Sequence, residues 1–190
     1  MIYLIDNYDS FTYNLYQLIG TRTEHEVRVV THDALTAAEL AALQPDAVVF
    51  SPGPGRPENA GNMPAMIAQL RGRVPMFGVC LGMQAMAQAY GATITGAPVL
   101  MHGRSDQLTQ QTTNVLLRGC PETFTAARYH SLVATNVPET LTVGALGSDG
   151  SVMTIENVAD KVFGVQFHPE SIMTDGAVGA GIIDNFLAQI

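Results

Sequence analysis

A cysteine flanked by two glycines lies in the segment Gly78-Val79-Cys80-Leu81-Gly82, directly after the apolar run at residues 74–77. This spacing is typical of a nucleophile elbow, in which a strand turns sharply into a helix and presents a nucleophile at the turn. Glycines at the flanks remove the Cβ atoms that would clash with the strained nucleophile. At a helix N-terminus the positive end of the helix dipole favours the thiolate. Cys80 is therefore a candidate nucleophile, although a small buried cysteine is the commoner role of this residue type.

A histidine that could act as the base follows the apolar stretch at residues 162–167. His168 begins the sequence His168-Pro169-Glu170, and residues two apart in extended backbone face the same side. The carboxylate of Glu170 could then hold one ring nitrogen while the other faces the thiol. A surface turn is the alternative interpretation. The remaining histidines have no such neighbour and are poorer candidates: His25, His32, His102 and His130.

A loop rich in proline and glycine, Ser51-Pro52-Gly53-Pro54-Gly55, follows another apolar stretch at residues 47–50. Proline has no N–H, so Gly53 and Gly55 are the residues that can present free backbone donors within this loop. One of them, together with the N–H of Leu81, could form an oxyanion hole. A tight turn without a chemical role would have the same composition. The dinucleotide-binding pattern G-x-G-x-x-G is absent.

The elements that would position these groups alternate between short apolar strands and helical patterns in the first half of the chain. We expect strands at residues 2–5, 27–30, 47–50 and 76–79, and helices at 10–19, 36–43, 63–70 and 82–90. Ser10 and Thr36, the latter with Glu39 in a capping box, should begin two helices, and Gly91 should end the fourth. This alternation predicts an α/β fold with an open, mainly parallel central sheet flanked by helices, as in flavodoxin-like proteins. The loops after residues 5, 50 and 79 should then converge on one crevice.

The second half of the chain consists of strand-sized apolar segments separated by Gly, Pro, Asn and Asp. We expect added β-strands at residues 93–95, 115–117, 132–134, 141–143 and 162–167, and a final helix at 177–187. No low-complexity tract or run of like charge interrupts the 190 residues, so we expect one domain over residues 1–190.

Charge and composition argue against several classes of partner. The chain has 9 Lys and Arg against 17 Asp and Glu, a net charge of −8, which argues against nucleic acid. No apolar run approaches the ~20 residues that span a bilayer, so we expect a cytoplasmic protein without a membrane partner. The two cysteines make no disulfide framework, and no Cys or His pair has zinc-ligand spacing, so we expect no metal site.

Three segments in the order SPGPG, GVCLGMQ and FGVQFHPES resemble the class I (triad) glutamine amidotransferases, and the resemblance extends over essentially the whole chain. The segments DNYDSFTYNL at residues 6–15, MHGRS at 101–105 and RYHSL at 128–132 are similar, more narrowly, to the glutaminase subunits of anthranilate synthase and of aminodeoxychorismate synthase. SPGPG and ARYHSLV favour the anthranilate synthase group.

The resemblance implies hydrolysis of L-glutamine through a cysteine thioester and delivery of ammonia to a chorismate-using large synthase subunit. It implies no cofactor in this chain and Mg²⁺ in the partner. The implied catalytic triad is Cys80, His168 and Glu170, with an oxyanion hole at Gly53 and Leu81. The implied glutamine site comprises Gly53, Pro54, Gly55, Gln84, Ser131 and Leu132. The loops implied to contact the partner are Tyr8, Asp9, Ser10 and Phe11, and His102, Gly103, Arg104 and Ser105.

Two positions depart from the pattern of this subgroup. Met83 occupies a position where histidine is frequent, and Arg104 one where lysine is frequent. A planar guanidinium and an ammonium bind differently, so Arg104 bears on the fit of the partner rather than on catalysis. Three other functions remain compatible with the residues. They are a stand-alone cysteine hydrolase of γ-glutamyl or peptide bonds, a catalytically silent binding subunit, and a flavodoxin-like nucleotide binder. The prolines of SPGPG disfavour the last because they remove phosphate-binding donors.

Overall fold

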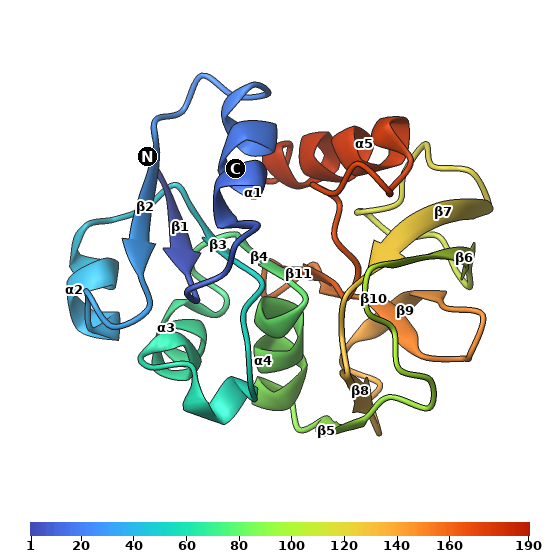
Figure 1. Cartoon of the computed structure of the whole chain (residues 1–190). Helices are drawn as coiled ribbons and strands as arrows, with labels where there is room; N and C mark the ends of the chain where they lie inside the picture. The colour runs from blue at the N-terminus through green and yellow to red at the C-terminus, as the bar shows by residue number, and fades with distance from the viewer.

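A computed structural model describes residues 1–190 and contains a nine-stranded sheet of order β2-β1-β3-β4-β11-β10-β9-β6-β7 (Figure 1). The first five strands of this order are parallel: β2 (Val27–Thr31), β1 (Ile2–Asp6), β3 (Ala47–Phe50), β4 (Met76–Val79) and β11 (Val162–Val165). The other four pair antiparallel: β10 (Val152–Asn157), β9 (Thr142–Leu146), β6 (Arg104–Gln110) and β7 (Thr123–Arg128). A separate pair joins β5 (Thr93–Gly96) to β8 (Leu132–Thr135). The predicted α/β class is confirmed.

Helices cover both faces of the parallel half of the sheet. They are α1 (Thr12–Gly20), α2 (Ala37–Ala42), α3 (Met63–Leu70), α4 (Leu81–Ala89) and α5 (Gly176–Leu187), with a 3₁₀ turn η1 at Pro57–Asn59. Ile2 and Leu4 pack in one cluster with α1 and α5, whereas Tyr3 and Ile5 pack in a second with α2, α3 and α4. Figure 1 shows the same division, with α1 and α5 above the sheet and α3 and α4 below it. Burial on both faces explains the continuous apolar runs of β1, β3, β4 and β11, whereas the edge strand β2 is only partly buried and contains Arg28.

Two of the three predicted helix caps are present. Thr36 and Glu39 form the expected capping box before α2, and Gly91 follows α4 with φ +102°. The predicted cap at Ser10 is wrong because α1 begins at Thr12 and Ser10 makes no capping hydrogen bond. Asp9 Oδ1 instead accepts from the amide of Phe11 at 2.8 Å. This turn precedes the helix and orders the chain that leaves β1.

The predictions for the second half need correction. Residues 115–117 form a turn rather than a strand, because the amides of Val115 and Leu116 donate to the buried carboxylate of Glu156 at 2.9–3.3 Å. The strands β6, β7 and β10 were not expected. The final strand ends at Val165 rather than at residue 167, and the chain then pairs with β7 through an isolated bridge between Ala127 and His168. None of the helices combines the length and the apolar character that crossing a membrane requires.

Candidate active site

Cys80 lies at the sharp turn between β4 and α4, with φ +53° and ψ −103°. Both glycines of the elbow are sterically required. A Cβ on Gly78 would lie 2.5 Å from the carbonyl carbon of Gly82, and a Cβ on Gly82 would lie 2.5 Å from the carbonyl oxygen of Phe50. The expected clash was with the nucleophile itself. In the structure the added Cβ atoms would instead clash between the first turn of α4 and the residues packed against it, Gly78 and Phe50. The strained backbone of Cys80 is thus held by close packing on both sides.

His168 reaches the same edge of the sheet because β11 lies parallel and next to β4, with Val165 opposite Val79. The amide of Cys80 donates to the carbonyl of Val165 at 2.8 Å, which ties the elbow to the strand that precedes His168. Parallel strands in register end at one edge, so the thiol and the imidazole are brought together from segments more than eighty residues apart.

The imidazole of His168 pairs with Glu170 as the two-residue spacing predicts, with 2.7 Å between Nδ1 and Oε1. Both side chains are buried, and the other ring nitrogen, Nε2, makes no hydrogen bond within the chain. Burial alone would lower the pKa of His168. The interactions of the ring with the neighbouring Cys80 and with the hydrogen-bonded carboxylate of Glu170 outweigh burial and raise this pKa to about 10. The site therefore favours a protonated imidazole beside the sulfur.

Two aromatic rings pack against His168. Phe11 lies 5.3 Å and Tyr129 lies 4.8 Å from its ring centroid, both in edge-type arrangements, and the two rings are 5.0 Å apart. The backbone of His168 is also held, because its amide donates to Ala127 O at 3.0 Å and its carbonyl accepts from Thr174 Oγ1 at 2.6 Å. Sequence reasoning did not assign Tyr129, although it lies in the RYHSL segment. The imidazole is thus fixed from several sides.

A pocket of about 320 Å³ opens beside the elbow. It brings together residues that the sequence assigned to the glutamine site and two that it assigned to the partner loops. It also includes two residues that were not assigned. The lining is Asp9, Gly53, Pro54, Gly55, Cys80, Gln84, His102, Tyr129, His130, Ser131 and Leu132. All six residues implied to bind glutamine therefore lie around the thiol.

The amides of Gly53 and Leu81 donate no hydrogen bond within the chain, so both remain free to bind an anion near Cys80. Asn7 holds the Gly53 loop in place. Its amide donates to Ser51 Oγ and its Nδ2 to Ser51 O, both at 2.8 Å. A Cβ on Gly53 would lie 2.5 Å from Asn7 Cβ and 2.8 Å from Leu81 Cδ2, so this glycine permits the close approach of loop and elbow. The sequence contained no local signal for this role of Asn7.

Gln84 lies one helical turn after Cys80 and joins the elbow to β8. Its Nε2 donates to Leu132 O at 2.9 Å and to Gln166 Oε1 at 3.0 Å. Its Oε1 accepts no hydrogen bond from the chain. This oxygen is an acceptor available to a bound ligand.

The residues predicted to contact a partner are placed in two different environments. Tyr8 and Ser10 are exposed, as is the whole stretch from His102 to Ser105. Phe11 is half-buried and packs against His168 of the same chain. Arg104 and Ser105 begin β6 and do not form a loop, which corrects that expectation.

Comparison with known proteins agrees with these observations. The family model "Glutamine amidotransferase class-I" matches residues 3–190. Anthranilate synthase component 2 of Lactococcus lactis is 42% identical over 100% of this chain and 95% of that protein. Aminodeoxychorismate synthase component 2 of Escherichia coli is 43% identical over 98% of this chain and 99% of that protein. A solved structure from Thermoplasma acidophilum, described as a GMP synthase protein, has a TM-score of 0.87 at 23% identity, covering 99% and 92% of the two chains. It shows the fold alone. The chain belongs to the class-I glutamine amidotransferase family.

Proposed function

We propose that this chain is the glutaminase subunit of a chorismate-using synthase and releases ammonia from L-glutamine through a thioester on Cys80. One observation carries the proposal. The strained Cys80 lies beside the buried His168–Glu170 pair and lines a pocket with Gly53, and the amides of Gly53 and of the adjacent Leu81 are both free. A nucleophile, a proton donor and oxyanion donors therefore surround one point.

In the first step the Cys80 thiolate attacks the carboxamide carbon of glutamine, and a C–S bond forms while the carbonyl oxygen gains negative charge. The amides of Gly53 and Leu81 bind this oxyanion, and each such donor contributes roughly 3–4 kcal/mol in comparable sites. Nε2–H of His168 then protonates the departing nitrogen, the C–N bond breaks and ammonia leaves. The raised pKa of His168 keeps the proton available for this transfer.

In the second step the neutral His168 accepts a proton from water through Nε2 as the water oxygen attacks the thioester carbon. The C–S bond breaks, the thiolate is restored, and glutamate leaves. Glu170 accepts the Nδ1–H of His168 at 2.7 Å and so keeps Nε2 directed at the reacting atoms in both steps.

The partner follows from the chemistry of the product. Ammonia released into neutral water becomes ammonium, which is not a nucleophile, so the acceptor subunit must receive it directly. Both curated relatives named above are second components of synthases. We assign the partner to an anthranilate synthase large subunit, which would supply its own Mg²⁺, on the basis of SPGPG and ARYHSLV.

The second candidate function is the glutaminase subunit of aminodeoxychorismate synthase. It is favoured by the Escherichia coli relative, whose identity of 43% is as high as that of the Lactococcus relative at 42%. A stand-alone hydrolase is the remaining alternative, and it would turn over glutamine without any partner.

The test measures anthranilate fluorescence after this chain is mixed with the anthranilate synthase large subunit of its own host, chorismate, Mg²⁺ and glutamine. Cys80→Ser and an ammonium chloride reaction run beside it. A signal that requires glutamine and Cys80, with ammonia-dependent synthesis intact in Cys80→Ser, supports the proposal. If only ammonia gives a signal, the large subunit of aminodeoxychorismate synthase is tested next. Failure with both large subunits would overturn the proposed function.

A further inference from the structure

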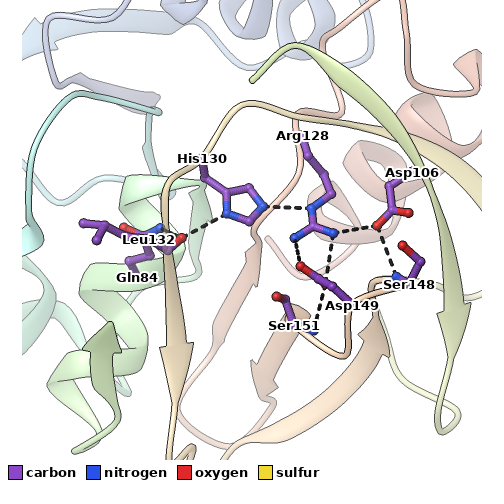
Figure 2. A network of polar contacts seen from close by, with 8 residues as sticks. All are labelled: Gln84, Asp106, Arg128, His130, Leu132, Ser148, Asp149 and Ser151. Atoms are coloured by element: carbon purple, nitrogen blue, oxygen red, sulfur yellow. Dashed lines mark hydrogen bonds and ion pairs between the residues drawn. The ribbon is translucent and has the colours of Figure 1, made fainter. Parts of the chain in front are cut away.

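A network of buried polar contacts runs from Asp106 and Asp149 through Arg128 and His130 to Leu132 and Gln84 (Figure 2), and its last three residues line the pocket beside Cys80. Arg128, at the end of β7, is wholly buried. Its guanidinium donates to Asp106 Oδ2 at 2.6 Å and to both carboxylate oxygens of Asp149 at 2.9 and 3.0 Å. The amides of Ser148 and Ser151 complete the shells of these carboxylates at 3.2 and 3.1 Å. Two aspartates thus share one arginine, which leaves a net charge of −1 in the network, and most of its polar groups are paired.

The Nε–H donor of the guanidinium fixes the tautomer of His130. Arg128 Nε lies 3.0 Å from His130 Nε2 and always carries a hydrogen, so His130 Nε2 must accept. A neutral ring that accepts at Nε2 carries its proton on Nδ1. That proton is donated to Leu132 O at 3.0 Å. Burial, and next the charge of Arg128, lower the pKa of His130 to about 4, so the ring is neutral near pH 7.

The carbonyl of Leu132 connects this network to the candidate active site. It accepts from His130 Nδ1 and also from Gln84 Nε2, at 3.0 and 2.9 Å. Gln84 is linked to the elbow through its amide, which donates to Cys80 O at 3.0 Å. His130, Leu132 and Gln84 all line the pocket. Figure 2 shows the ring of His130 between the guanidinium and this carbonyl.

We propose that His130 is a positioning residue: held in its Nδ1–H tautomer by Arg128, it fixes the carbonyl of Leu132 and thereby orients Gln84 for binding glutamine. The inference rests on the proposed glutaminase function. His130 contacts neither the sulfur nor the His168–Glu170 pair by any hydrogen bond. Its influence is therefore on substrate binding rather than on bond cleavage.

Two isosteric variants separate this role from a purely structural one. Asn places an amide donor near the position of Nδ1, so His130→Asn keeps the bond to Leu132 O and loses the acceptor for Arg128. Gln places its terminal amide near Nε2, so His130→Gln keeps the contact with Arg128 and loses the bond to Leu132 O. We expect KM for glutamine to rise about tenfold in His130→Gln and to stay within about threefold of wild type in His130→Asn, with kcat little changed in both.

The assay is glutamine-dependent and ammonia-dependent synthesis in the complex described above, and ¹⁵N NMR of the wild-type imidazoles gives the tautomer without any assay. If Cys80→Ser hydrolyses glutamine as fast as wild type, the proposed function is refuted. The tautomer of His130 is then still tested by NMR. An Nε2–H tautomer would overturn the positioning role, as would an unchanged KM in His130→Gln or an equal rise in both variants. If His130→Gln loses ammonia-dependent synthesis as much as glutamine-dependent synthesis, the positioning role is also overturned. Such a loss would report damage to the fold or to partner binding.

Discussion

Gly82 packs directly against Phe50: a Cβ atom on Gly82 would lie 2.5 Å from the carbonyl oxygen and 2.8 Å from the Cβ of Phe50. The first turn of α4 therefore rests on the end of β3, the strand that leads into the Ser51–Gly55 loop. One close contact thus sets the distance between the elbow that carries Cys80 and the loop that carries Gly53. Both halves of the candidate oxyanion hole depend on it.

Gly82→Ala should therefore destabilise the protein by about 1–3 kcal/mol and reduce glutamine-dependent activity, because backbone atoms cannot yield as a flexible side chain can. Urea unfolding and the glutamine assay measure the two effects. Gly181→Ala in α5 is the matched control, since its Cβ would meet nothing within 4 Å and alanine favours the helix. A Gly82→Ala protein as stable as Gly181→Ala would refute the packing argument.

Local backbone chemistry accounts for what the sequence predicted well. The elbow around Cys80, the capping box at Thr36 and the positive φ at Gly91 each depend on residues within a few positions of one another. The His168–Glu170 contact is equally local. These features were predictable because the physical cause and its effect lie in the same short segment.

Contacts between distant residues account for what the sequence did not predict. Strand β6 turns Asp106 inward opposite Ala126 of β7, and the buried charge is compensated by the guanidinium of Arg128, two residues further along β7, which donates to Asp106 Oδ2 at 2.6 Å. An inward carboxylate breaks the apolar alternation by which strands are recognised. Residues 115–117 were mistaken for a strand because three apolar residues look alike in a strand and in a buried turn. Their true partner, Glu156, is 41 residues away from Val115.

The basicity of His168 gives a second prediction. Against the effect of burial, the neighbouring Cys80 and the hydrogen-bonded carboxylate of Glu170 raise its pKa to about 10. Glu170→Gln keeps the shape and removes the charge. The pKa of His168 should then fall, and the imidazole should lose its proton at lower pH. Activity requires the protonated ring to protonate the departing amide nitrogen so that it leaves as ammonia; the basic limb of kcat/KM should therefore move to lower pH and kcat should fall about 10–100-fold. Glutamate release is followed from pH 7 to 10.5, and an unmoved basic limb would contradict the assignment.

The depressed pKa of His130 predicts a loss of stability in acid. Its pKa is about 4 in the folded protein against 6.5 for an unperturbed histidine, so the unfolded chain binds a proton that the folded chain refuses between these values. Stability from this group is fully present above pH 6.5 and is lost as the pH falls from 6.5 to 4, to a total of about 3 kcal/mol. His130→Asn lacks the titrating group. Its unfolding free energy should therefore fall less than that of wild type between pH 7 and 4.5.

Urea unfolding at several pH values measures this difference. Asp149 does not confuse the comparison, because its pKa of about 2 places its own loss of stability below pH 4. Parallel wild-type and His130→Asn curves between pH 7 and 4.5 would show that His130 is not held neutral in the folded state.

Asn7 supplies the last prediction, because it anchors the loop of the candidate oxyanion hole without contacting the reacting atoms by any hydrogen bond of its own. Asn7→Ala removes the bond from Nδ2 to Ser51 O and leaves that buried carbonyl without its donor, at a cost of about 1–3 kcal/mol. The Gly53 amide should also lose its fixed position. Because an oxyanion donor acts on the transition state, kcat should fall about tenfold or more while KM changes little.

Asn62→Ala is the control for this effect. Asn62 Nδ2 likewise donates to a backbone carbonyl, that of Leu35 at 3.0 Å, but Asn62 does not line the pocket. Its replacement should lower stability and leave kcat nearly unchanged. If the two variants lose stability to a similar extent and Asn7→Ala alone loses kcat, the loss arises from the position of the loop. Equal kcat in both variants would mean that the Gly53 amide holds its place without Asn7, or that it does not bind the oxyanion.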